Sequence, residues 1–63
     1  MEPEARNQIN YYQAGMVGHW LNINDGELYF GKIIRSFQDF TNSQLKVYLT
    51  LATDFGSITI RVY

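Results

Sequence analysis

The residues best suited to chemistry lie together in the polar segment 38–42, which reads Gln-Asp-Phe-Thr-Asn. Phe40 offers a flat apolar ring on which an unpaired base can stack, and Asn42 offers a donor and an acceptor that can read the edge of that base. Asp39 places a carboxylate beside the ring. Base stacking is worth roughly 1–3 kcal/mol per base, so such a site needs few charges. The same residue types also form ordinary polar loops, in which Phe40 would simply tuck into the fold.

Side chains for catalysis or metal binding are scarce in this sequence. It contains one histidine, His19, and no cysteine. The acidic residues are scattered, and turn chemistry accounts for Asp25, which precedes a glycine. No phosphate-binding loop, catalytic triad or metal-ligand cluster is present in the pattern. We therefore expect a protein that is not an enzyme and has no cofactor or metal site, with His19 as a hydrogen-bonded structural residue on an apolar strand face.

Composition and charge limit the other functions. The net charge of −1, from five basic and six acidic residues, argues against a general binder of duplex DNA or of acidic membranes. A hydrophobic fraction of 46% with 16% aromatic residues is too apolar for a disordered chain. A domain of 63 residues buries only about 60% of its unfolded surface, which favours association with further copies of itself. No apolar run reaches the roughly 18 residues of a membrane span, and we expect a cytoplasmic location.

The segments that would position these residues are mostly short and alternating. We expect one helix and four antiparallel strands, at residues 3–14, 16–24, 27–37, 45–52 and 57–63. The pair Asp25-Gly26 predicts a two-residue type I′ turn between the first two strands. The fold class is then all-β: a single domain that forms a small, strongly bent antiparallel barrel, Sm-like or SH3-like, with an N-terminal α-helix.

Alternation along the strands predicts which side chains are buried. Gly31 interrupts the second strand, where a glycine permits either a sharp bend or the close approach of another backbone. In that strand Ile33 and Phe37 are expected to share one face, with Phe30 on the other. The predicted core consists of Leu45, Val47, Leu49, Leu51, Ile58 and Ile60.

Two short patterns resemble the signatures of the Sm/LSm family, which includes the bacterial Hfq proteins. The first is a turn pair, an apolar residue, a glycine, an apolar residue two positions on, and then an Asp near an Asn. The second is Ile-Arg followed in the family by glycine. In this chain they are Asp25-Gly26, Tyr29, Gly31, Ile33, Asp39 and Asn42, and then Ile60-Arg61-Val62. The chain is similar to a short, divergent member, a kind found in phages as well as in cells.

The resemblance implies a function and a site. In the family, the Asn and the Arg of the two signatures hold a uracil-like base, and the residue two before the Asn stacks on it. Carried over, Asn42 and Arg61 would hold the base and Phe40 would stack, with Asp39 beside them. The family assembles as homo-oligomeric rings, which implies a ring of roughly five to seven subunits that binds single-stranded, uridine-rich RNA.

This chain departs from the family pattern at three points. Val62 stands where the family has glycine, the interval from Gly31 to Asn42 is one residue longer, and the family's short fifth strand has no counterpart. These departures and the acidic balance leave a second interpretation open, a structural or protein-interaction module with an SH3-like barrel and no nucleic-acid function. A third interpretation is a small-ligand binder that uses Trp20, His19 and nearby tyrosines.

Overall fold

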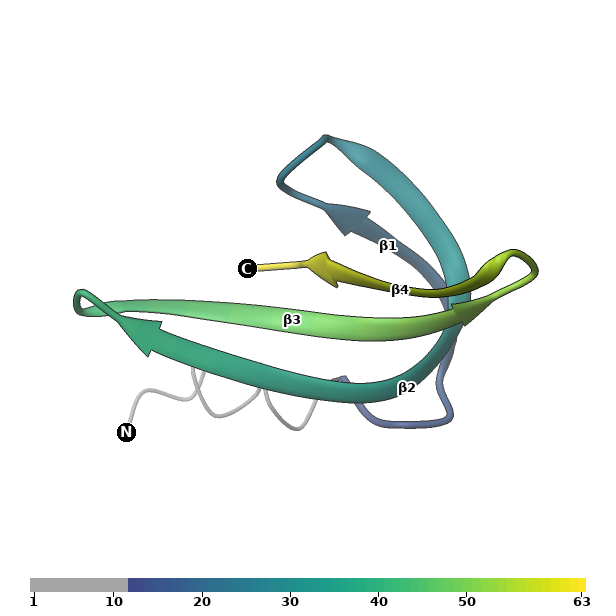
Figure 1. Cartoon of the computed structure of the whole chain (residues 1–63), viewed down its shortest axis with the longest axis horizontal. Coiled ribbons are helices and arrows are strands. Elements are labelled where there is room, and N and C mark those ends of the chain that lie inside the picture. Colours follow the sequence, from purple (N-terminus) through teal and green to yellow (C-terminus); the bar gives the residue numbers. More distant parts are fainter. Residues whose placement is uncertain (1–11) are drawn as a thin grey trace.

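The protein is a curled antiparallel sheet of four strands (Figure 1). The computed structural model describes residues 12–63. The strands are β1 (Val17–Asn22), β2 (Glu27–Thr41), β3 (Gln44–Thr53) and β4 (Gly56–Arg61). Each strand pairs with the next in the chain, so the order β1-β2-β3-β4 is a meander with β1 and β4 at the edges. The expected all-β class and antiparallel meander are confirmed. The four strands form an open sheet, so the predicted barrel is not confirmed.

The N-terminal helix expected over 3–14 falls largely outside the described residues. Residues 12–14, the part of that range within the described chain, form a bend and the start of a turn rather than a helix. The segment is tied to the sheet, because the Ser36 hydroxyl donates to the Tyr12 carbonyl at 2.8 Å and the Gly15 amide donates to the Ile33 carbonyl at 2.8 Å. No helix among residues 12–63 is long and apolar enough to cross a membrane.

The connection between β2 and β3 differs from the expected polar loop at 38–42. Strand β2 continues to Thr41, which pairs with Gln44, so only Asn42 and Ser43 connect the two strands. Both have positive φ, 55° and 60°, as a type I′ turn requires. The twist of that turn matches the twist of the strands, and asparagine tolerates the left-handed region better than most residues. The result is a long, projecting hairpin (Figure 1).

The connection between β1 and β2 also differs from the prediction. It is four residues long, Ile23 to Gly26, and not a two-residue type I′ turn. Only the glycine has a positive φ, 75°. The Asn22 carbonyl accepts hydrogen bonds from the amides of Gly26, at 2.8 Å, and Asp25, at 3.3 Å. The chain therefore turns around one carbonyl, and this geometry needs a left-handed residue only at its last position.

A β-bulge divides β2 into two halves. Ile33 pairs with Leu51 and Arg35 pairs with Thr50, which leaves Ile34 as an extra residue. The extra residue reverses the alternation of faces, so Phe37 does not share the face of Ile33 as expected. Here the face that carries the buried cluster is called the inner face, and the opposite one the outer face. Ile33 lies on the inner face and Phe37 on the outer face.

Gly31 lies close to the backbone of β3. A Cβ atom at this position would lie 2.7 Å from the carbonyl oxygen of Ala52 and 3.2 Å from Cβ of Leu51. Of the two roles expected for this glycine, the close approach of another backbone is the one that the structure requires.

The core is small and lies on the inner face. Its most buried side chains, each at most 1% exposed, are Ile33, Val47, Leu49, Leu51 and Ile60. Partly buried residues pack against it: Tyr12, Trp20, Tyr29, Ile58 and Val62. The predicted core is thus confirmed for Val47, Leu49, Leu51 and Ile60, whereas Leu45 and Ile58 are half-buried.

The two edge strands approach each other where β1 and β4 end. The Ile23 amide donates to the Arg61 carbonyl at 2.8 Å, and the Arg61 amide donates to Oδ1 of Asn22 at 3.2 Å. Asn22 is only 9% exposed, and its Oδ1 also accepts from the Asn24 amide. A buried amide oxygen with two donors is well satisfied, and here it links the turn after β1 to β4. The sheet curls far enough for this contact while β1 and β4 remain its edges.

Candidate nucleic-acid interface

The tip of the β2–β3 hairpin holds three of the four residues expected to bind RNA. Phe40 is 70% exposed and pairs across the hairpin with Leu45. Asp39 pairs with Lys46 and accepts a hydrogen bond from the Thr41 hydroxyl at 2.7 Å. The hairpin therefore presents an uncovered phenyl ring on the face of Leu45, and Asp39 and Thr41 lie on the opposite face, so the structure does not bring Asp39 to the Phe40 ring.

Asn42 lies in the two-residue turn at the end of this hairpin. Its positive φ of 55° gives it a structural role that is independent of any ligand, because asparagine is favoured in this conformation. Its side chain is exposed and lies two residues from Phe40 in the chain. The amide is thus available to a ligand at the tip.

Arg61 lies elsewhere, at the end of β4, opposite Tyr48 of β3. Its side chain is held near the end of the chain, because Nε donates to the Tyr63 carbonyl at 2.9 Å. Its neighbour Ile60 is buried on the inner face, so Arg61 points to the outer face. Phe40 is on the inner face, because it pairs with Leu45, which alternates in step with the buried Val47 and Leu49. Within one chain the structure does not bring Phe40 and Arg61 together.

A second group of aromatic and basic side chains lies on the outer face of β2, β3 and β4. The rings of Phe37 and Tyr48 stack across the hairpin, with centroids 5.2 Å apart and planes 15° from parallel. The guanidinium carbon of Arg35 lies 4.6 Å from the centroid of the Phe37 ring. Arg61 is the cross-strand neighbour of Tyr48 on the next strand, and Lys46 precedes Tyr48 by two residues on the same face.

Sequence reasoning missed the site-forming potential of this group. Alternation along β3 correctly turns Lys46 and Tyr48 away from the core. It places Phe37 on the wrong face, because the bulge at Ile34 carries no signal in residue type. Only the pairing register shows that Arg35, Phe37 and Tyr48 belong together.

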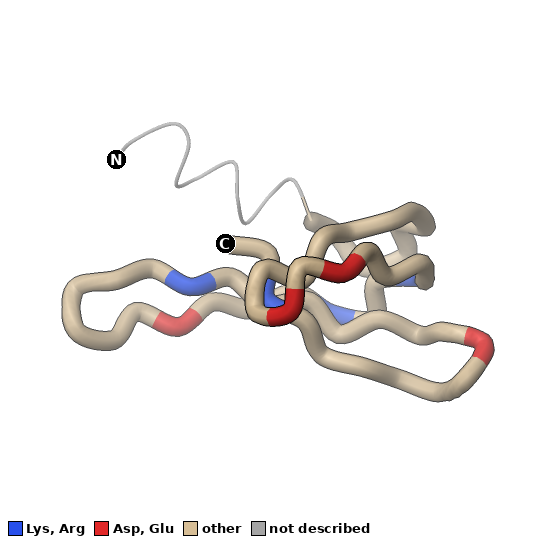
Figure 2. The backbone as a smooth tube through the Cα atoms, turned by 90° about the horizontal axis from the view of Figure 1, so that it is seen from above, with Lys and Arg blue, Asp and Glu red and all other residues tan. Residues whose placement is uncertain are grey.

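Charge is distributed unevenly between the strands and the turns (Figure 2). All four basic residues of the described chain, Lys32, Arg35, Lys46 and Arg61, alternate onto the outer face. Of the four described acidic residues, Asp25 and Asp54 lie in turns, Glu27 begins β2, and Asp39 alone is on the outer face within a strand interior. Four positive charges against one negative charge give this face an excess of three, although the whole chain has a formal charge of −1.

Asp25 serves the β1–β2 turn. Its carboxylate accepts hydrogen bonds from the Tyr29 hydroxyl and, at 2.9 Å, from the Glu27 amide. The bond from Tyr29 lowers the pKa of Asp25 below its ordinary value, and the bond from the Glu27 amide lowers it further. The same contact raises the pKa of Tyr29. Among the described residues, no group of three or more His, Cys, Asp or Glu side chains could hold a metal ion.

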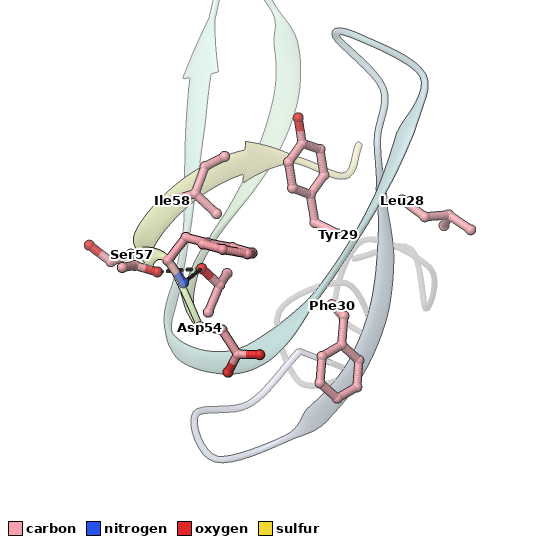
Figure 3. A pocket seen from close by; sticks show the side chains of 9 residues that line it. Leu28, Tyr29, Phe30, Asp54, Ser57 and Ile58 are labelled. Carbon is pink, nitrogen blue, oxygen red and sulfur yellow. Dashed lines mark hydrogen bonds between the residues drawn. The ribbon is translucent and has the colours of Figure 1, made fainter.

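An open apolar hollow of about 490 Å³ lies between the start of β2 and the β3–β4 turn (Figure 3). Tyr29, Phe55 and Ile58 are among its lining residues, and Leu28 points away from it. Phe55 is fully exposed at the turn. Its lining also includes Thr53, Asp54 and Ser57, and the Thr53 hydroxyl is engaged within the turn, where it donates to the Gly56 carbonyl and accepts from the Phe55 amide.

The residues of the third interpretation do not share a site. Trp20 packs against the core on the inner face. His19, the next position back along the strand, is on the outer face, where its ring lies 4.7 Å from that of Phe30. A ligand in contact with one of these side chains would therefore be separated from the other by the sheet.

In comparisons with known proteins, no protein-family model, no curated protein and no solved structure matches the chain.

Proposed function

We propose that this protein is an Sm-like, single-stranded RNA-binding protein that works as a homo-oligomer and holds bases by stacking. The observation that carries the proposal is the exposure of Phe40, 70%, at the end of a projecting hairpin between Asp39 and Asn42. A phenyl ring in water gains free energy from an apolar or aromatic cover, and a base supplies one with edges that Asn42 can read. Uridine-rich RNA is the substrate class that the two sequence signatures favour.

Assembly is part of the proposal because one chain leaves much apolar surface uncovered. Eleven large apolar side chains of the described residues are 38% or more exposed, and both β1 and β4 are edge strands. Edge strands with free backbone groups pair readily with other chains. We propose a ring of roughly five to seven copies, in which edge pairing completes small barrels. Since Phe40 and Arg61 lie on opposite faces of one chain, a base that contacts both would lie between two copies.

The test combines the assembled mass with RNA binding in the same sample. Sedimentation should give a closed oligomer, and a fluorescently labelled uridine-rich RNA should bind it with increasing anisotropy. Phe40→Ala should weaken binding by about 5- to 150-fold per occupied site, the equivalent of roughly 1–3 kcal/mol, and leave the mass unchanged. Asn42→Gly should weaken it too, and glycine keeps the positive φ of the turn.

Phe55→Ala is the matched control for Phe40→Ala. Phe55 is a fully exposed phenylalanine in the turn between β3 and β4. Its replacement removes the same chemical group, a phenyl ring, from a different place. RNA affinity should not change in this variant. A protein that is a monomer at micromolar concentration, or that binds no RNA, contradicts the proposal.

A second candidate function is supported by the outer face of β1 and the first half of β2. Val17, Leu21, Leu28 and Phe30 alternate onto this face and are 60%, 47%, 66% and 56% exposed. Such a patch is typical of a surface that contacts protein. A stable oligomer without any RNA affinity would favour this candidate, a structural or protein-interaction module.

A further inference from the structure

We propose that the outer face of β2, β3 and β4 is a second base-binding surface, formed by Arg35, Phe37, Tyr48 and Arg61. We call these four residues the outer ladder. The inference rests on the proposed RNA-binding function and adds to it a second place where the protein contacts the RNA. It locates this place on the sheet surface and not at the hairpin tip.

The outer ladder is a preformed column of flat groups. The Tyr48 ring stacks on the Phe37 ring with centroids 5.2 Å apart, and the guanidinium carbon of Arg35 lies 4.6 Å from the centroid of the Phe37 ring. Cross-strand pairing fixes the order Phe37, Tyr48, Arg61 over three adjacent strands. A base can extend this column by stacking on the Arg35 guanidinium or on the Tyr48 ring. Bases stack on guanidinium planes as well as on aromatic rings.

The charges around the column suit the backbone of a nucleic acid. Arg35, Lys46 and Arg61 lie on the same face as the two rings, and Asp39 is the single acid among them. The excess of positive charge is confined to this face. It can therefore attract an RNA strand to the face even though the protein as a whole is not basic. Stacking groups inside a basic surface on a β-sheet are a common arrangement for single-stranded nucleic acid.

The outer ladder and the hairpin tip lie on opposite faces of the sheet. Phe40 is on the inner face and the ladder is on the outer face, so one base cannot contact both rings of the same chain. An RNA strand that passes around the edge of the hairpin can contact the tip and the ladder in turn. Binding at the first place raises the local concentration of the RNA at the second. Loss of either place should thus weaken binding without abolishing it.

The experiment titrates labelled uridine-rich RNA with the intact oligomer and a set of outer-face variants. Arg35→Lys keeps the charge and removes the plane, and it should weaken binding about fivefold or more while the salt dependence stays the same. Phe37→Leu should also weaken binding. Lys32→Gln is the control, because it removes a positive charge from the same face outside the ladder, and it should have the smaller effect on affinity and lower the salt dependence. A crosslink from 4-thiouridine RNA to Tyr48, located by mass spectrometry, would report the contact directly.

The outcomes separate this inference from the proposed function. If the wild-type protein binds no RNA, both fail. If it binds RNA and Phe40→Ala weakens binding, but Arg35→Lys and Phe37→Leu bind as the wild type does and crosslinks avoid Tyr48, the proposed function stands and the outer ladder is refuted. Arg35→Lys alters a surface side chain, so this result does not depend on whether Phe37→Leu folds.

Discussion

Replacing Gly31 with alanine tests how tightly β2 and β3 pack against each other. The new Cβ would lie 2.7 Å from the Ala52 carbonyl oxygen and 3.2 Å from Leu51 Cβ. One neighbour is a backbone oxygen and the other is a Cβ atom, so neither can rotate away. The two strands must therefore separate by roughly half an ångström. Overpacking of this kind costs about 1–3 kcal/mol. Alanine recovers roughly 0.4–1 kcal/mol by restricting the unfolded chain.

The net expectation for Gly31→Ala is a loss of about 1–2 kcal/mol of unfolding free energy. A chain of 63 residues has a total stability of roughly 3–9 kcal/mol, so this loss is a large share of it. For a domain of this size it corresponds to a fall in Tm of about 5–15 °C. The measurement is urea unfolding followed by the fluorescence of Trp20, the single tryptophan. The protein concentration is held fixed, because the stability of any protein that associates depends on it.

Gly18→Ala is the matched control. Gly18 lies directly across from Gly31 in the β1–β2 register, and a Cβ there would meet its nearest atom, in the Trp20 ring, at 3.4 Å. That distance is an ordinary contact, so this variant should be equal to the wild type or more stable by up to about 1 kcal/mol. If Gly31→Ala proves as stable as Gly18→Ala, the close approach of β3 does not exist and the register of the sheet is wrong.

Three further changes test the turns and the core. Ser43→Gly should raise the unfolding free energy by about 0.5–1 kcal/mol in the same urea assay, because Ser43 has a φ of 60° and glycine adopts it without strain. Leu49→Ala should cost about 2–5 kcal/mol, visible as loss of strand signal in circular dichroism, because Leu49 is fully buried. Tyr29→Phe removes the hydroxyl that lowers the pKa of Asp25, so an NMR titration should place that pKa closer to its ordinary value of 3.8. A lowered pKa gives stability that is present above the unfolded-state value and is lost as the pH falls through the folded-state pKa, so below about pH 4 the variant should lose less stability than the wild type.

Strand β3 shows which part of the fold the sequence determines by itself. Leu45, Val47, Leu49 and Leu51 alternate with polar or aromatic residues without interruption. This strand pairs with a neighbouring strand on each side, so its inward side chains are covered. Val47, Leu49 and Leu51 are fully buried. A local period of two residues is enough to predict this arrangement.

The turns show where local signals fail. Asp25-Gly26 has the stronger hairpin signal, yet the two-residue turn with two positive φ values is formed by Asn42 and Ser43. At the first connection the chain instead turns around the Asn22 carbonyl, and the Asn22 side chain binds the Arg61 amide on β4. A contact between residues 39 positions apart thus accompanies the longer connection. Residue types near a turn carry no information about such a partner.

The candidate site depends on the bulge more than on any side chain. With uninterrupted alternation from Ile33, an inner-face residue, Phe37 would also face inward and Phe40 would face outward, on the face of Arg61. The extra residue at Ile34 exchanges these directions, so Phe37 joins Tyr48 and Arg35 on the outer face and Phe40 is turned away from Arg61. The bulge lies in the interval from Gly31 to Asn42. Neither residue type nor periodicity marks which of the residues in that interval is bulged, because the choice depends on how β3 pairs with both halves of β2. The residues of the hairpin tip could therefore be named from the sequence, whereas the faces of Phe40 and Arg61, and hence the outer ladder, required the register of the folded sheet.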